Sequence, residues 1–275
     1  MLASRPALEG AGVHLRRAFG PGEVPLADPF LMLDDFHSAN PADYTAGFPW
    51  HPHRGIETVT YMVDGVVKHG DSIGNKGIIE SGDVQWMTAG GGILHEEMPQ
   101  PWTGMMQGFQ LWVNLPAAEK MMIPRYRDVK GSQIPLVSTK TGAQVKLISG
   151  EMNDSRGPAS DLVVDVQYLD VAIPPGKELR HHVKHGSKAI AYVFGGSGLF
   201  HPDSKNAIGP EHTIIFGEGK DLRIKAGDEG VRFLLFSGPP LEEPVAWGGP
   251  IVMNTQAELD LAYREFRSGT FIKQR

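Results

Sequence analysis

The feature that most constrains the fold is an order of short segments that occurs twice along the chain. In each half, a histidine-containing stretch precedes an apolar strand ending in glycine, and a Gly-Asp turn with another strand follows further on. The first copy reads "HPHRGIETVTYMVDG" and "SGDVQWM", and the second reads "HHVKHGSKAIAYVFGG" and "AGDEGVRFLLF". The identity is weak but the order is shared, which is typical of a duplicated module. We therefore expect two copies of one β-module.

Composition supports an all-β fold, and the repeat supports two domains. The chain of 275 residues holds 34 glycines and 21 prolines, and only 21% of its residues are charged. This favours many short strands joined by tight turns over long helices. We place the domains at residues 1–130 and 131–275. The second should end in a helix at about residues 255–268, because Thr255 and Glu258 form a capping-box pattern there.

Charge and cysteine content exclude several classes of protein. The formal net charge of -6 and the pI of 6.0 argue against direct nucleic-acid binding, which usually needs a basic face. No cysteine is present, so any metal must be held by nitrogen and oxygen ligands. No apolar run is long enough for a signal peptide or a membrane span. We expect a cytoplasmic protein that does not act at a membrane.

Two histidines one residue apart form the first candidate metal site. His51 and His53 stand just before the strand-like run "ETVTYMV". Alternate residues of a strand point to the same side and lie roughly 6 to 7 Å apart along the backbone. Both rings can therefore converge on one ion. A His-x-His pair alone is more often structural, so a second pair of ligands is needed.

The second pair follows the glycines of "DVQWMTAGGGILHEEMP". His95 and Glu97 share one face of an extended segment, and Glu96 points the other way. Together, His51, His53, His95 and Glu97 give three imidazoles and one carboxylate. This set leaves two positions of an octahedron open for a substrate and dioxygen. It suits Fe(II) foremost, with Mn, Co, Ni, Cu or Zn as alternatives.

Other polar residues have less favourable patterns for a metal site. Glu57 would lie about 13 Å from His53 on an uninterrupted strand, so we expect it to support a ligand or to pair with Arg54. Asp34, Asp35 and Phe36 fit a turn and the mouth of the barrel better than a catalytic pair. Gln110 and Trp112 are candidates to line the barrel. In the second half, His181, His182 and His185 have no second pair of ligands, so we interpret them as a solvated strand edge.

The segments "HPHRG", "GDVQWMTAGGGILHEEMP", "FLMLDDF", "LWVNLP", "MMIPRY" and "GPIVMNT" resemble those of the pirin family of the cupin superfamily. The resemblance spans nearly the whole chain. It implies a bicupin with two jelly-roll-like β-barrels, of which only the N-terminal one binds iron. The family's ligands fall on His51, His53, His95 and Glu97. Trp50 replaces the residue that most often precedes the motif, which should affect the pocket wall more than the metal.

The resemblance implies two functions of different classes. One is a quercetin 2,3-dioxygenase type of oxygenase, which opens a flavonol ring with O2 and releases carbon monoxide. In that case Glu97 would complete the metal's ligands and could act as the catalytic base for the substrate's hydroxyl proton. The other is a redox-sensitive, iron-containing regulator that binds a protein partner, either a transcription factor or a metabolic enzyme.

Overall fold

A computed structural model describes residues 1–273 and divides the chain into two compact units. The first unit holds residues 6–24, residues 30–131 and the chain from Leu241 onward. The second unit holds residues 1–5, 25–29 and 132–240. Strands dominate both units, so the expected all-β class is confirmed.

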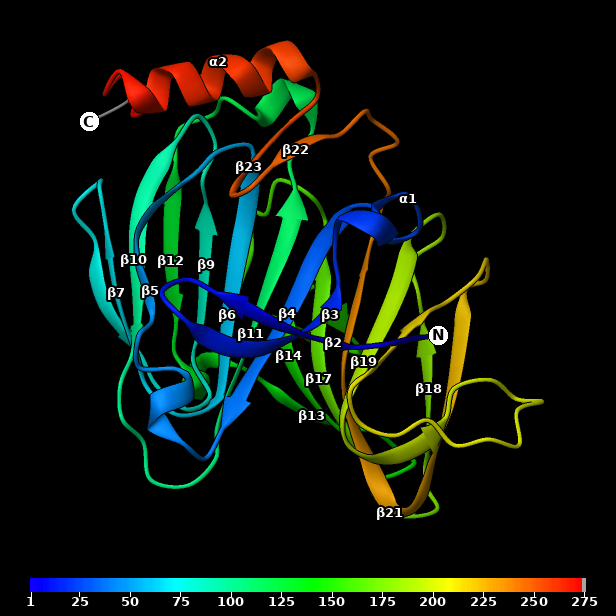
Figure 1. The fold of residues 1–275 in the computed structure, drawn as a ribbon. Coiled ribbons are helices and arrows are strands. Elements are labelled where there is room, and N and C mark those ends of the chain that lie inside the picture. Colours follow the sequence, from blue (N-terminus) through cyan, green and yellow to red (C-terminus); the bar gives the residue numbers. More distant parts are fainter. Residues whose placement is uncertain (274–275) are drawn as a thin grey trace. The chain divides into compact units, whose positions relative to one another are not determined.

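The first unit is built from two antiparallel sheets (Figure 1). In the described residues, the larger sheet has the order β12 (Arg125–Val129), β9 (Val84–Thr88), β6 (Ile56–Asp64), β11 (Met106–Asn114), β4 (Phe30–Ser38), β3 (Val13–Phe19) and β2 (Arg5–Glu9). The smaller sheet has the order β5 (Phe48–His53), β10 (Ile93–Pro99), β7 (Val67–Asp71) and β8 (Lys76–Ile79).

Apolar side chains from both sheets share one interior. Val67 of β7 and Ile79 of β8 pack with Phe36 of β4 and Met62 of β6, so the two sheets close over a common core. Burial of these side chains supplies the main driving force for closing the sheets. The histidine-bearing strands β5 and β10 are thereby held opposite the larger sheet.

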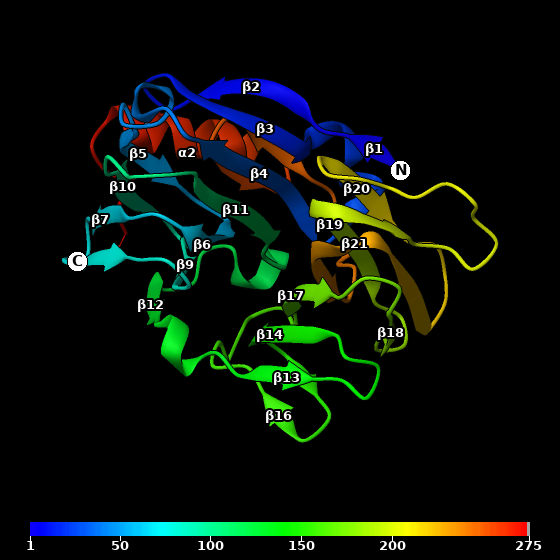
Figure 2. The same cartoon turned by 90° about the horizontal axis from the view of Figure 1, so that it is seen from below.

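The second unit is one curled sheet with an apolar interior. Its strands in the described residues follow the order β1 (Leu2–Ala3), β20 (His212–Ile215), β19 (Lys188–Leu199), β21 (Asp221–Gly238), β17 (Gln167–Ile173), β14 (Gln144–Ser149) and β13 (Leu136–Ser138), and β18 (Glu178–His182) also pairs with β21. Figure 2 shows β13, β14 and β17 in succession at one edge. Val137 of β13 and Ile214 of β20 share one cluster, so the far ends of the sheet meet over the same core.

The C-terminal segment belongs to the first unit, which differs from the expected domain of residues 131–275. The hairpin of β22 (Ala246–Gly248) and β23 (Ile251–Met253) contacts helix α2 (Gln256–Arg267), as Figure 1 shows. Val252 is buried in the same cluster as Ile56 of β6, which explains the placement. The predicted helix and its capping box between Thr255 and Glu258 are confirmed.

The remaining elements are short. They comprise α1 (Val24–Ala27), the strand pair β15 (Glu151–Met152) and β16 (Ser155–Arg156), and the 3-10 turns Pro21–Glu23, Pro41–Asp43, Ala117–Glu119 and Gly131–Gln133. The turn expected at Asp34, Asp35 and Phe36 is wrong, because all three lie within β4, where Asp34 pairs with Arg17 across the sheet. No helix of residues 1–273 is long and apolar enough to cross a membrane.

Candidate metal centre

Three histidines converge at one end of the first unit. His51 and His53 lie on β5, and His95 lies opposite His51 on the neighbouring strand β10. Alternate residues of a strand share a face, and directly paired residues of neighbouring strands share one too, so all three side chains lie on the same face of the smaller sheet. One ring nitrogen from each histidine falls within 4.8 Å of the others, and this group could hold a metal ion.

The hydrogen bonds of His51 and His53 fix the position of their protons. Nδ1 of His51 lies 3.0 Å from the carbonyl oxygen of Pro49, and Nδ1 of His53 lies 3.0 Å from that of Pro250. A carbonyl oxygen only accepts, so each Nδ1 carries the hydrogen and each Nε2 of a neutral ring has a free lone pair. Backbone carbonyls orient metal-binding histidines in this way in other metal sites.

The two Nε2 atoms lie only 3.0 Å apart. Two lone pairs at this distance repel each other unless a cation lies between them or one ring is protonated. Burial lowers the pKa of His51, and burial with the neighbouring His51 lowers the pKa of His53 well below its ordinary value, so protonation is disfavoured. Two nitrogen ligands about 2.1 Å from a metal, at a right angle, are about 3 Å apart. The spacing fits a metal ion.

His95 completes the three-histidine group without any hydrogen bond of its own. Its side chain is fully buried, and neither ring nitrogen has a partner among the described residues. Leaving such a polar group unpaired costs about 1–3 kcal/mol, and a bound metal ion would offset this cost. Burial, with the neighbouring His53 and His51, lowers the pKa of His95 well below its ordinary value, which keeps the ring in the neutral form that binds metals.

Glu97 lies on the same strand as His95, but its carboxylate is not part of the three-histidine group. Its Oε1 accepts a hydrogen bond from the Thr60 hydroxyl at 2.7 Å, and its Oε2 accepts one from the Gln110 amide at 2.6 Å. A β-bulge between His95 and Glu97 shifts the pairing of β10 with β5. The structure brings together three of the four predicted ligands, and the role of Glu97 as the fourth stays a prediction.

A cavity of about 680 Å³ opens beside His51 and His53. Trp112 and Trp247 form part of its wall with ring centroids 5.8 Å apart, and the Trp112 ring is nearly perpendicular to the His53 ring, with centroids 5.1 Å apart. Gln110 also lines the cavity, and its Oε1 accepts a hydrogen bond from Trp112. Flat apolar walls with a few convergent polar groups are typical of a small-molecule site.

The loop after the β5 histidines is anchored to the C-terminal segment. The buried guanidinium of Arg54 donates to the carbonyls of Gly91 and Phe271 and pairs with Glu265 at 2.7 Å. Gly55 has a φ of +77°, and a Cβ there would meet the carbonyl oxygen of Val252 at 2.0 Å, so only glycine fits. This anchoring holds the backbone of His53 in place.

The expected pairing of Glu57 with Arg54 is wrong. Glu57 accepts a hydrogen bond from Thr88 at 2.6 Å, and Arg54 pairs with Glu265 instead. Burial raises the pKa of Glu57, against the opposing effect of the Thr88 hydroxyl. Glu57 is not a member of the three-histidine group.

Sequence reasoning missed a fourth histidine, which is buried beside the centre. His69 of β7 stacks on Tyr126 at 5.0 Å and lies 5.5 Å from the ring of His95. Its Nε2 is 3.5 Å from the carboxylate of Asp71, two residues further along the strand. In the sequence "HGD", His69 and Asp71 are two residues apart, as are the residues of the two ligand motifs. This spacing could have identified His69 as a candidate.

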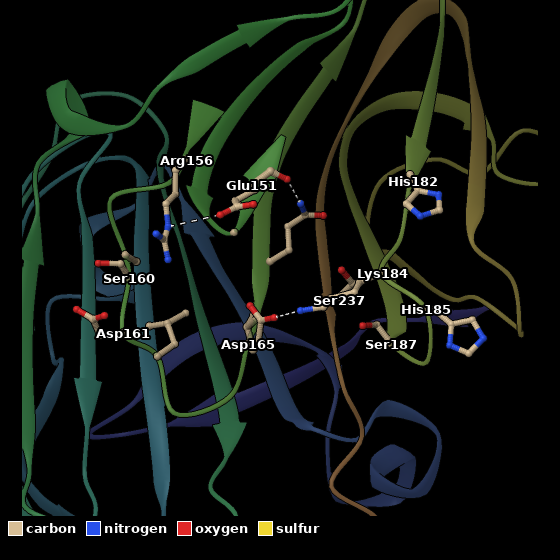
Figure 3. A pocket seen from close by; sticks show the side chains of 15 residues that line it. Glu151, Arg156, Ser160, Asp161, Asp165, His182, Lys184, His185, Ser187 and Ser237 are labelled. Atoms are coloured by element: carbon tan, nitrogen blue, oxygen red, sulfur yellow. Dashed lines mark hydrogen bonds and ion pairs between the residues drawn. The ribbon is translucent and has the colours of Figure 1, made fainter. Parts of the chain in front are cut away.

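Two histidines of the second unit, His182 and His185, line a separate, polar pocket of about 650 Å³ (Figure 3). His182 pairs with Asp221, and His181 is buried and bonds to Gln167 at 2.6 Å. Figure 3 shows Lys184 against Asp165 on one wall, where the two side chains form an ion pair. These groups satisfy one another and do not converge on a common point.

Two family models match most of the chain. Residues 12–113 match the family described as Pirin, and residues 168–272 match the Pirin C-terminal cupin domain. The first match contains the three histidines.

Two relatives and a solved structure are similar to nearly the whole of this chain. A pirin-like protein of Caulobacter vibrioides is 42% identical over 272 residues, covering 98% of this chain and 97% of that protein. A Pseudomonas aeruginosa protein, named provisionally as a quercetin 2,3-dioxygenase, is 41% identical over 96% of this chain and 94% of its own. The crystal structure of quercetin 2,3-dioxygenase from Acinetobacter baumannii superposes with a TM-score of 0.89 at 34% identity, over 98% of this chain and 95% of that one.

Proposed function

Because this chain belongs to the pirin family, we propose that it is a metal-dependent dioxygenase that opens the ring of a flavonol with O2. The observation that carries the proposal is the pair of Nε2 lone pairs 3.0 Å apart at the wall of an indole-lined cavity. The naming of the Pseudomonas and Acinetobacter relatives as quercetin 2,3-dioxygenases supports the choice of reaction.

We assign His51, His53 and His95 as metal ligands and Glu97 as the fourth. Three imidazoles and one carboxylate suit Fe(II) foremost, although Mn, Co, Ni, Cu or Zn can occupy such a set. When bound, the metal would supply Lewis acidity and a template for flavonol and O2. The Pro49 and Pro250 carbonyls keep both Nε2 lone pairs available for it.

The remaining residues have roles in orientation and proton transfer. Trp112 and Trp247 offer planar faces that would orient a flat ligand against His53. Glu97 is the candidate catalytic base for the ligand's hydroxyl proton, since Thr60 and Gln110 hold its carboxylate in one orientation.

The test is oxygen consumption with quercetin by Fe(II)-loaded protein, with the metal content determined. His53→Ala should lose both metal and turnover. His185→Ala should keep both, because His185 is an exposed residue of the second unit. Absence of turnover by fully loaded wild-type protein would contradict the dioxygenase and would favour an iron-containing regulator that binds a protein partner.

A further inference from the structure

A row of polar side chains crosses the larger sheet of the first unit beneath the cavity. Thr60 of β6 lies opposite Gln110 of β11, Gln110 lies opposite Asp34 of β4, and Asp34 lies opposite Arg17 of β3. Neighbouring strands are about 4.8 Å apart, so Arg17 is about 10 Å from the strand of Gln110. Because Thr60 and Gln110 bind Glu97, the row leads from the candidate metal centre to a second polar end of the cavity.

Arg17 is held at this second end by two carboxylates. Its Nε and Nη2 donate to the two oxygens of Asp34 at 2.9 and 2.8 Å, and Nη2 also lies 2.9 Å from Glu9. Such a bidentate pair fixes the plane of the guanidinium. All three residues line the cavity. Among the described residues the remaining nitrogen, Nη1, has no hydrogen-bond partner, and the side chain is 22% exposed.

The charge at this end indicates which ligand group it can bind. One guanidinium stands against the two carboxylates of Glu9 and Asp34, so the wall carries an excess of negative charge. A ligand carboxylate or phosphate would be repelled by it. A hydroxyl group fits, because it can accept from Nη1 of Arg17 and donate to the half-buried carboxylate of Glu9.

We propose that Arg17 and Glu9 determine specificity by binding a ring hydroxyl of the ligand at the end remote from the three histidines. The preferred class is then flavonols that carry further hydroxyls beyond the metal-binding one. This inference rests on the proposed function. Neither residue touches the reacting atoms, so both act on ligand choice and not on the chemistry.

The experiment compares two probes in the absence of oxygen with Fe(II)-loaded protein. One is 3-hydroxyflavone, which lacks further hydroxyls, and the other is kaempferol, which carries them on both other ring systems. Quenching of the cavity tryptophans, Trp112 and Trp247, reports binding. We expect kaempferol to bind about 10-fold more tightly, the effect of about one hydrogen bond to a charged group.

Variants separate specificity from folding. Arg17→Met should bring the two affinities within about 2-fold by weakening kaempferol alone, since only kaempferol uses the lost hydrogen bond. Because this change leaves Asp34 without its partner, Glu9→Met is the second variant, as it keeps the Arg17–Asp34 pair and should also reduce the preference. Arg16→Met is the matched control, since Arg16 does not line the cavity.

The outcomes distinguish this inference from the proposed function. Equal affinity of the wild-type protein for both probes would overturn the inference alone. So would a loss of affinity for both probes in folded Glu9→Met, because that pattern indicates a structural role. Failure of the wild-type protein to bind either flavonol would overturn the proposed function and, with it, this inference.

Discussion

Glu97 is held by two neutral donors, which separates its possible roles as ligand and as base. Glu97→Gln keeps the shape of the side chain and one oxygen that can bind a metal, but it removes the charge and the basicity. We expect turnover to fall about 100-fold, as for loss of a general base, while metal content falls less than about 2-fold. Oxygen consumption and metal analysis on the same preparation measure both.

The matched control is Glu96→Gln, one residue away on the opposite face of β10. It should leave metal content and turnover unchanged, because its side chain points away from the interior. Equal losses of metal and turnover in Glu97→Gln would make Glu97 a ligand only and would contradict its role as base.

Single residues of the centre could be predicted from sequence where they follow the two-residue alternation of a strand. His51, His53 and His95 follow the strand period of two, and the structure brings them together. The carbonyl of Pro250 could not be predicted, because it reaches His53 from 197 residues away. The contact of Arg17 with Asp34 was missed for a similar reason, since only the pairing of β3 with β4 shows that the two residues meet.

Among the elements, helix α2 is joined to the metal-binding strand through one buried ion pair. Glu265 on α2 holds the guanidinium of Arg54, whose side chain is 2% exposed. The pKa of Glu265 is lowered because the Lys273 and Arg54 contacts outweigh its burial. We expect Glu265→Gln to lower the free energy of unfolding by about 2–4 kcal/mol, because a buried charge loses its partner. Urea unfolding followed by tryptophan fluorescence measures it.

Asp260→Asn provides the control on the same helix. Asp260 is exposed, and within residues 1–273 its side chain bonds only to Gln256, so its change should alter the free energy of unfolding by less than about 0.5 kcal/mol. A loss in Glu265→Gln no larger than in Asp260→Asn would show that the ion pair does not hold α2. The pH dependence gives a second check. A carboxyl with a lowered pKa adds stability above its unfolded pKa of about 4.3, and this is lost as the pH falls through the folded value.

The local structure of α2 could be predicted from sequence, but its position could not. Thr255 and Glu258 are three residues apart, so their capping box is visible in a short window. The contact of Glu265 with Arg54 joins residues 211 positions apart, which no periodicity records. The expected partner, Glu57, was closer in sequence but lies against Thr88 on β9.

For the whole molecule, the order of segments repeated in the sequence gives equivalent sheet positions for the first strand of each copy but not for the second. "ETVTYMV" and "KAIAYVF" form β6 and β19, each of which is third in the strand order of its sheet. The two Gly-Asp segments are not equivalent, because "GDVQWM" forms β9 while "GDEGVRFLLF" lies in β21 between β19 and β17. By sheet position the counterpart of β21 is β11. A weak sequence repeat therefore predicts the order of strands along the chain, but it does not predict which strands are neighbours in a sheet.

Confinement of the candidate centre to the first unit predicts how the molecule responds to metal removal. His51, His53, His95 and the Pro250 carbonyl all belong to that unit, and so do all five tryptophans. A metal at about 100 times its Kd would stabilise the fold by about 2.7 kcal/mol, so a chelator should lower the unfolding midpoint reported by tryptophan fluorescence. Amide hydrogen exchange should accelerate in β5, β10 and β23 and stay unchanged in β17, β19 and β21. Equal acceleration in the second unit would show that the metal stabilises the whole chain as one cooperative body.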